Sequence, residues 1–136
     1  MKQIFLDTNF LLLPGQYALN IIDEIERILH EKYLLLVLDE TMTEIKKIVE
    51  EQKGLHKTAA RLALEIIKKN GIQIKDTSLL QERKNTHHVD DLLFAIAHAQ
   101  PFHTMIATQD KQLRERLKKR GVPCIVMKGK THLEIM

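Results

Sequence analysis

The chain has 136 residues, of which 44% are hydrophobic and 29% charged, and its net charge at pH 7 is +3. This length suits one domain, so we expect residues 1–136 to form a single domain. The single cysteine, Cys124, excludes an internal disulfide and a cysteine zinc cluster, and it fits a reducing compartment. No apolar run approaches membrane-spanning length, and Asp7 and Asn9 interrupt the apolar N-terminal residues. We therefore expect a cytoplasmic protein with no membrane partner.

In the first part of the chain, continuous apolar runs alternate with a segment whose apolar residues recur at helical spacing. Residues 2–6 form a short apolar run that predicts a buried strand, and Pro14-Gly15 predicts a turn after it. Apolar residues at helical spacing then predict a helix over 17–30. A second continuous apolar run predicts another buried strand over 33–38.

Two helices and a third strand are expected in the middle of the chain. Asp39 and Thr41 are both possible N-caps for a helix that ends at Gly54. Residues 56–69 carry apolar side chains at helical spacing and predict the next helix. The short apolar run at 72–74 predicts the third strand.

The last part of the chain repeats the alternation. Residues 76–86 are polar without a clear period, which favours a loop. A strong helical pattern covers 88–99, and an apolar run predicts a fourth strand over 103–107. A further helix is expected over 109–119, followed by a fifth strand over 123–127.

Strands separated by helical connections imply right-handed crossovers and a parallel sheet that is covered on both faces. The predicted fold class is therefore α/β, a three-layer αβα sandwich with a central parallel sheet of about five strands. In such folds the functional site lies beyond the carboxyl ends of the strands, where the strand order reverses.

Acidic residues stand at the positions that this rule singles out. Asp7 follows the first predicted strand directly, and Asp110 follows the fourth. Glu44 lies one turn into the helix after the second strand, while Asp90 and Asp91 open the helix before the fourth. We expect these side chains to gather at one edge of the sheet.

The same residues carry a family resemblance. Its motifs are Phe5-Leu6-Asp7-Thr8-Asn9, then Glu44, then Asp90 followed by Leu93, Ala95 and Ala97, and finally Ala107-Thr108-Gln109-Asp110. In this order and spacing they resemble the motifs of PIN-domain (PilT N-terminus) nucleases. The resemblance implies a PIN-like fold and a divalent-metal-dependent endoribonuclease that hydrolyses phosphodiesters.

One branch of that family is especially similar. The similarity rests on Val89-Asp90-Asp91 with Leu93, Ile106-Ala107-Thr108-Gln109-Asp110 with Leu113-Arg114, Gly121-Val122-Pro123, and His132-Leu133-Glu134. These stretches resemble the PIN nucleases of small-subunit ribosome biogenesis. That resemblance implies cleavage of precursor ribosomal RNA.

The chemistry of clustered carboxylates supports a metal site independently. Carboxylates brought together repel one another, and a hard divalent cation such as magnesium or manganese removes that cost. The expected direct or water-mediated ligands, which are also the catalytic residues, are Asp7, Glu44, Asp90 and Asp110. The expected supporting hydrogen-bond groups are Thr8, Asn9 and Thr108. Asp90 fits the PIN pattern through Leu93 and Ala95, whereas Asp91, about 100° further round the helix, is a possible contributor from a second layer.

Each acid also has a structural interpretation. Asp7 and Asp110 could be helix caps, and Asp90 could be a helix N-terminal charge. Glu44 could form an exposed ion pair with Lys47. The joint order of the acids, rather than any one of them, favours the catalytic interpretation.

A basic stretch follows Asp110 and gives a candidate RNA contact. Its members nearest to the acids are Lys111 and Arg114, with Lys118 one turn further on. They predict a phosphate-binding rim beside the acidic pocket, the alternative being a solvated helix face.

Other features carry less functional weight. The histidines, His87-His88 among them, match no standard zinc spacing, so surface or cap roles are favoured. Cys124 reads as a small buried hydrophobic residue. Aromatic residues make up 4% of the chain and none is tryptophan, which does not support a base-stacking platform.

Three functions follow, in order of preference. The first is an endoribonuclease that processes precursor ribosomal RNA, with a ribosome-assembly factor as a possible partner. The second is a toxin ribonuclease of the VapC type, which cleaves tRNA or rRNA and is held by an antitoxin. The third is a catalytically silent PIN domain that binds RNA or protein. A homodimer is plausible in each case, and a receiver or phosphatase is disfavoured because the chain has no counterpart of the receiver's acidic pair and phosphoacceptor.

Overall fold

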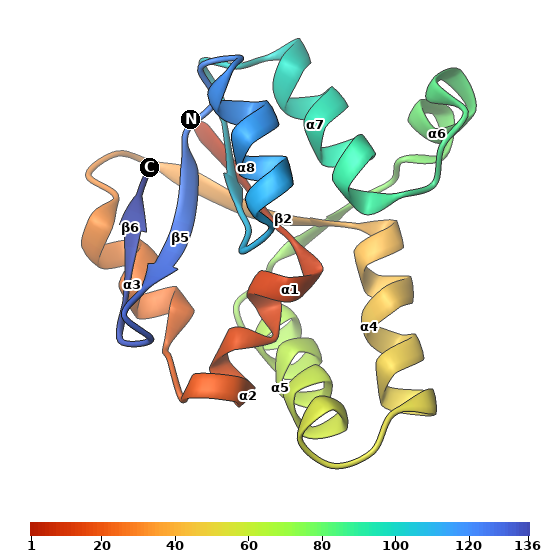
Figure 1. Ribbon diagram of the computed structural model, residues 1–136, viewed down its shortest axis with the longest axis vertical. Helices are drawn as coiled ribbons and strands as arrows, with labels where there is room; N and C mark the ends of the chain where they lie inside the picture. Colours follow the sequence, from red (N-terminus) through yellow and green to blue (C-terminus); the bar gives the residue numbers. More distant parts are fainter.

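The computed structural model describes all 136 residues. The strands are β1 Lys2–Leu6, β2 Tyr33–Leu38, β3 Gln73–Lys75, β4 Thr104–Ala107, β5 Cys124–Lys128 and β6 His132–Ile135 (Figure 1). The helices are α1 Thr8–Leu11, α2 Leu13–Tyr17, α3 Ile21–Ile28, α4 Asp39–Glu51, α5 Leu55–Lys69, α6 Ser78–Lys84, α7 Val89–Ala99 and α8 Lys111–Lys118. No helix combines the length and the apolar character needed to cross a membrane.

All six strands form one sheet in the order β3-β2-β1-β4-β5-β6. The pairs are parallel except for β5 and β6, which are antiparallel. The predicted α/β class with a central parallel sheet is confirmed, but the expected number of about five strands is corrected to six. Gly129 and Lys130 have φ angles of 60° and 61°, and this double positive-φ turn suits a tight hairpin that returns β6 onto β5. Residues 132–135 are too short to show strand periodicity on their own.

The sheet lies between two layers of helices. Because successive strand residues point to opposite faces, Ile4 and Leu6 of β1 enter one core while Phe5 enters the other. The first core also holds Ile25 of α3 and Ile45 of α4, together with side chains from α1, α2 and α5. The second core takes its helical residues from α7 and α8, and Figure 1 shows these two helices together on one side. The expected three-layer arrangement is confirmed.

The structure differs from the expectation around α2. The helix expected over 17–30 is present as α3, but its predicted start at 17 is wrong, because Ala18 adopts a left-handed conformation (φ 53°) that separates α2 from α3. The turn expected at Pro14-Gly15 is also wrong, since both residues lie within the first turn of α2, where proline is tolerated. Gly15 is required for packing, because a Cβ there would come within 2.6 Å of the Ala59 Cβ atom.

The segment between β3 and α7 also differs. The loop expected over 76–86 contains α6. Asp39 and Thr41 are not N-caps, because α4 already begins at Asp39 and has no side-chain cap. The Asp39 carboxylate instead accepts hydrogen bonds from the backbone N–H (3.1 Å) and the hydroxyl (2.5 Å) of Thr77, which anchors the start of α6.

The strand order reverses at the middle of the sheet. The chain passes from β1 to β2 on one side, and β4 later pairs with β1 on the other, with Leu6 opposite Ala107. The carboxyl ends of β1 and β4 therefore lie side by side at the topological switch point, where ligands of open α/β sheets bind.

Candidate active site

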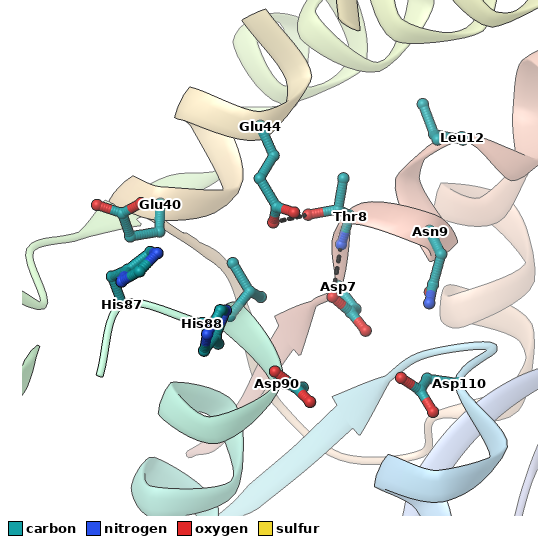
Figure 2. Close-up of a pocket in the computed structure, with 11 residues that line it drawn as sticks. Asp7, Thr8, Asn9, Leu12, Glu40, Glu44, His87, His88, Asp90 and Asp110 are labelled. Atoms are coloured by element: carbon teal, nitrogen blue, oxygen red, sulfur yellow. Dashed lines mark hydrogen bonds between the residues drawn. The ribbon is translucent and has the colours of Figure 1, made fainter. Parts of the chain in front are cut away.

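A pocket with a volume of about 500 Å³ opens at this edge of the sheet (Figure 2). Its lining residues are Asp7, Thr8, Asn9, Leu12, Glu40, Glu44, His87, His88, Val89, Asp90 and Asp110. Five of these eleven residues are acidic, two are histidines, and none is lysine or arginine. The pocket is thus strongly acidic, and the four acids predicted from the sequence all line it.

Asp7 lies at the base of the pocket and is 6% exposed. Its carboxylate accepts hydrogen bonds from the Thr8 backbone N–H (2.8 Å) and from the Thr108 hydroxyl (2.6 Å). Burial raises the pKa of Asp7 from 3.8 to about 6, and the nearby charges of Glu44 and Asp110 add to this rise against the lowering effect of the two hydrogen bonds. Asp7 also caps α1, as its structural interpretation predicted.

Thr108 connects the ends of β1 and β4. Its buried hydroxyl donates to Asp7 and accepts from the backbone N–H of Asp110 (3.0 Å). The side-chain oxygen of Asn9 accepts from the Gln109 backbone N–H (3.1 Å). Asp110 in turn caps α8 by accepting from the Leu113 backbone N–H (3.1 Å). This network fixes the two aspartates relative to each other.

Helix α4 supplies two glutamates to the opposite wall. The Glu44 carboxylate accepts a hydrogen bond from the Thr8 hydroxyl (2.9 Å), which ties it to the start of α1 (Figure 2). Glu40, one turn earlier on the same helix, accepts from the Gln81 side chain (3.3 Å). The sequence interpretation missed Glu40, although its spacing of four residues from Glu44 places both on one helix face.

The two adjacent aspartates of α7 have different surroundings. Asp90 lines the pocket, whereas Asp91 does not. The Asp91 carboxylate forms an ion pair with Arg116 of α8 (3.2 Å) and accepts from the Thr86 hydroxyl (3.3 Å). Arg116 also lies over the Phe94 ring, 4.4 Å from its centroid. Asp91 therefore holds α7 against α8 instead of facing the acids.

His87 and His88 form the remaining wall of the pocket (Figure 2). Both are exposed, and their rings lie 4.6 Å apart, centroid to centroid. His88 occupies the N-cap position of α7 without making a side-chain cap, and its backbone N–H donates to the Thr86 hydroxyl (3.2 Å). The expectation of a surface or cap role omitted their position among the acids, which depends on the fold of the segment before α7.

The basic residues expected to contact RNA lie elsewhere. Lys111, Arg114 and Lys118 line a separate hollow of about 460 Å³ between α8 and the C-terminal Met136. The Arg114 guanidinium donates to the Met136 sulfur (3.7 Å), and its Nε is buried without a partner. Lys111 follows Asp110 directly, but none of the three cations lines the acidic pocket.

The chemistry of the carboxylates can be compared with what a metal ion needs. As they stand, no three aspartate, glutamate, histidine or cysteine side chains are close enough together to hold one. The donors are nevertheless hard oxygen ligands without a lysine or arginine among them, and the charges of Glu44 and Asp110 add to the rise in the pKa of Asp7 that burial mainly causes. Magnesium keeps several water ligands and uses one or two carboxylates directly, so this donor set fits such an ion with water-mediated contacts.

Comparisons with known proteins agree with this fold. A family model described as "PIN like domain" matches residues 4–130, and the chain therefore belongs to the PIN-like domain family. This confirms the resemblance drawn from the motifs at the level of the family.

One relative and two solved structures are similar over nearly their full length. The chain is 30% identical to Ribonuclease VapC4 of Methanocaldococcus jannaschii over 137 residues, which is 99% of this chain and 97% of the relative. The PIN domain endonuclease Utp24 superposes with a TM-score of 0.75 at 19% identity, covering 98% and 90% of the two chains. A domain of a functionally unknown protein from M. jannaschii has a TM-score of 0.59 at 12% identity, covering 95% and 93%. The two structural likenesses show the fold alone.

Proposed function

We propose that this protein is a divalent-metal-dependent endoribonuclease. The observation that carries the proposal is the acidic pocket at the switch point of the sheet, in which Asp7, Glu44, Asp90 and Asp110 meet without a lysine or arginine. Membership of the PIN-like family and the 30% identity to a ribonuclease support it. The residues assigned as metal ligands are these four, and the assigned ion is magnesium or manganese.

The chemistry follows from the charges in the pocket. An RNA phosphate is repelled by a cluster of carboxylates, so substrate and pocket are compatible only when a cation neutralises the cluster. A bound divalent ion would also supply a water of lowered pKa at neutral pH, which is what phosphodiester hydrolysis needs.

The chain's own residues have distinct tasks in this proposal. Thr108 and the Thr8 backbone hold the Asp7 carboxylate in one orientation. The Thr8 hydroxyl does the same for Glu44. His87 and His88 carry N–H donors into the pocket and are assigned to the non-bridging oxygens of the substrate phosphate. Phosphates further along the strand are assigned to the cations beside α8, among them Lys111.

Two substrate classes are proposed, and different observations favour them. Precursor ribosomal RNA follows from the motifs shared with ribosome-biogenesis nucleases, and the partner is then an assembly factor. A VapC-type toxin that cleaves tRNA or rRNA is favoured at least equally by the full-length likeness to Ribonuclease VapC4, and the partner is then an antitoxin. Growth arrest on expression, relieved by a gene adjacent to this one, distinguishes the toxin from a maturation nuclease. Localisation in the cytoplasm and a homodimer remain predictions, and a silent domain is disfavoured because all four acids are retained.

The decisive test compares the neighbouring aspartates of α7. We expect wild-type protein to cleave single-stranded RNA with magnesium or manganese and to stop on addition of a chelator. Asp7→Asn and Asp90→Asn should each lower the single-turnover rate by more than the roughly 10–100-fold typical of losing a supporting group.

Asp91→Asn is the matched control, because Asp91 is adjacent in sequence but bonds to Arg116 outside the pocket. It should cleave at the wild-type rate. Equal loss in Asp90→Asn and Asp91→Asn would contradict the assigned site, and RNA binding without cleavage by wild type would favour a silent binding domain.

A further inference from the structure

A second, smaller hollow adjoins the acidic pocket. It has a volume of about 180 Å³ and shares two lining residues, Asn9 and Leu12, with the acidic pocket. Figure 2 shows Asn9 and Leu12 on the side of the acidic pocket away from His87 and His88. A strand that crosses the acids from the histidine wall therefore reaches this hollow next.

The hollow presents one aromatic ring to solvent. Tyr17, the last residue of α2, lines it and is 41% exposed. Ala18 then turns the chain away in its left-handed conformation, so α2 ends at this ring. Leu12 and Met127 give the hollow further apolar surface. An aromatic face beside apolar side chains is the kind of platform on which nucleobases stack.

Two side-chain amides in the hollow have NH2 groups that can donate hydrogen bonds to the edge of a base. The side-chain oxygen of Gln109 accepts a hydrogen bond from the Met127 backbone N–H (2.8 Å). The Asn9 side-chain oxygen likewise accepts from the Gln109 backbone N–H. Both amide oxygens are thus engaged, and the NH2 groups of the two side chains are the parts able to serve a ligand.

A cation lies over the ring. The Lys130 ammonium lies 5.8 Å from the centroid of the Tyr17 ring. Lys130 occupies the tip of the β5–β6 turn, which its positive φ and that of Gly129 define. The hollow thus combines apolar and amide side chains with one nearby cation and has no acidic residue, in contrast to the acidic pocket next to it. This combination suits a base with its phosphate.

We infer that this hollow binds one nucleobase of the RNA strand, adjacent to the phosphodiester cut in the acidic pocket, with the base stacked on Tyr17 and its phosphate near Lys130. The inference rests on the proposed function and adds a base-binding subsite to it. The low aromatic content of the chain did not support a base-stacking platform. We infer one nevertheless, since a single ring is enough when it lies beside the site.

The test is equilibrium binding of a fluorescently labelled single-stranded RNA with calcium in place of magnesium, because calcium also takes oxygen ligands and neutralises the acids. A gel run after each titration checks that the RNA is still intact. Because base stacking on an aromatic ring is worth roughly 1–3 kcal/mol, Tyr17→Ala should raise Kd by about fivefold to 150-fold. Tyr17→Phe keeps the ring and should bind within about twofold of wild type. Phe102→Ala is the matched control, since Phe102 is an aromatic residue 84% exposed at the opposite edge of the sheet, and its Kd should not change.

A second measurement locates the base. Abasic sites are introduced one at a time along the RNA, and wild type should lose affinity at one position beside the cleaved bond, whereas Tyr17→Ala should be indifferent there. An unchanged Kd for Tyr17→Ala in RNA that wild type cleaves would overturn the subsite and leave the nuclease intact. Wild type that neither binds nor cleaves RNA would overturn the proposed function, and the subsite with it.

Discussion

Burial and hydrogen bonding have opposite effects on the charge of the Asp7 carboxylate. Burial beneath the pocket destabilises its charged form, while the Thr8 and Thr108 hydrogen bonds favour that form without fully compensating. The charged form is the one that binds a cation. Under the proposed function, the charge that destabilises the metal-free protein is therefore the one that the cation needs.

The pH dependence of stability follows from the raised pKa of Asp7. The folded state binds this proton more tightly than the unfolded state, so the stability that this group contributes is greatest below pH 4 and is lost as pH rises from about 4 to about 6. The full difference is on the order of 3 kcal/mol.

Without metal at pH 7.5, Asp7→Asn should therefore be more stable than wild type by about 1–3 kcal/mol in urea unfolding. Near pH 4 the two proteins should converge. Parallel stability profiles across this range would contradict a buried, charged Asp7.

At the scale of elements, β6 is held to α3 by one charged pair. The Glu24 carboxylate accepts hydrogen bonds from the Arg27 guanidinium (2.8 and 3.0 Å) and from the Leu133 backbone N–H (2.9 Å). Arg27 also donates to the Leu133 carbonyl (3.0 Å). The pair thus replaces hydrogen bonds that the outer edge of an exposed strand would otherwise leave open.

Loss of this pair should weaken the C-terminal hairpin. Hydrogen bonding from Arg27, and then from Leu133, lowers the pKa of Glu24 to about 2, so its contribution is present above pH 4.5 and is lost as pH falls towards 2. Because the pair is partly solvent-screened, Glu24→Gln should cost only about 1 kcal/mol at pH 7.

Hydrogen exchange should show the loss first at the amides of β6. Glu26→Gln is the control, since Glu26 is an exposed residue of the same helix and should leave stability unchanged. Equal effects of the two substitutions would show that the Glu24 contacts do not anchor β6.

For the whole molecule, the site joins segments that are distant in the chain. Asp7 and Asp110 are about one hundred residues apart and meet because β1 and β4 pair at the switch point. Glu44 and Asp90 arrive on helices that pack against different faces of the sheet. A ligand that bridges these residues must therefore stabilise the fold as a unit.

Divalent cations should raise the melting temperature of wild-type protein. Binding to the folded state alone stabilises by about 2.7 kcal/mol at a concentration of 100 times Kd. Magnesium or manganese should thus shift the thermal transition of wild type and of Asp91→Asn, but not that of Asp7→Asn. Equal shifts in all three proteins would place the ion outside the acidic pocket, whatever the activity.

The sequence by itself determined the alternation of strands and helices and the positions of the four acids. Runs such as 33–38 are apolar throughout, which is a local property of a strand buried on both faces. Parallel topology then implied that Asp7 and Asp110 meet at one edge. The PIN-like motifs were readable for the same reason, since their order along the chain carries the information.

Only the tertiary structure decided the features that depend on distant contacts. The strand β6 forms because it pairs with the edge strand β5 and because the Leu133 backbone N–H donates to Glu24 of α3. The four residues of β6 alone carry no sign of either contact. Asp90 and Asp91 have nearly identical local surroundings, and their roles separate because Arg116 of α8 faces one of them. Tyr17 lines the hollow next to the acidic pocket, and Lys130 of the β5–β6 turn lies over its ring. Local propensity carries no signal for such arrangements, since the free energy that selects them comes from packing between segments far apart in the chain.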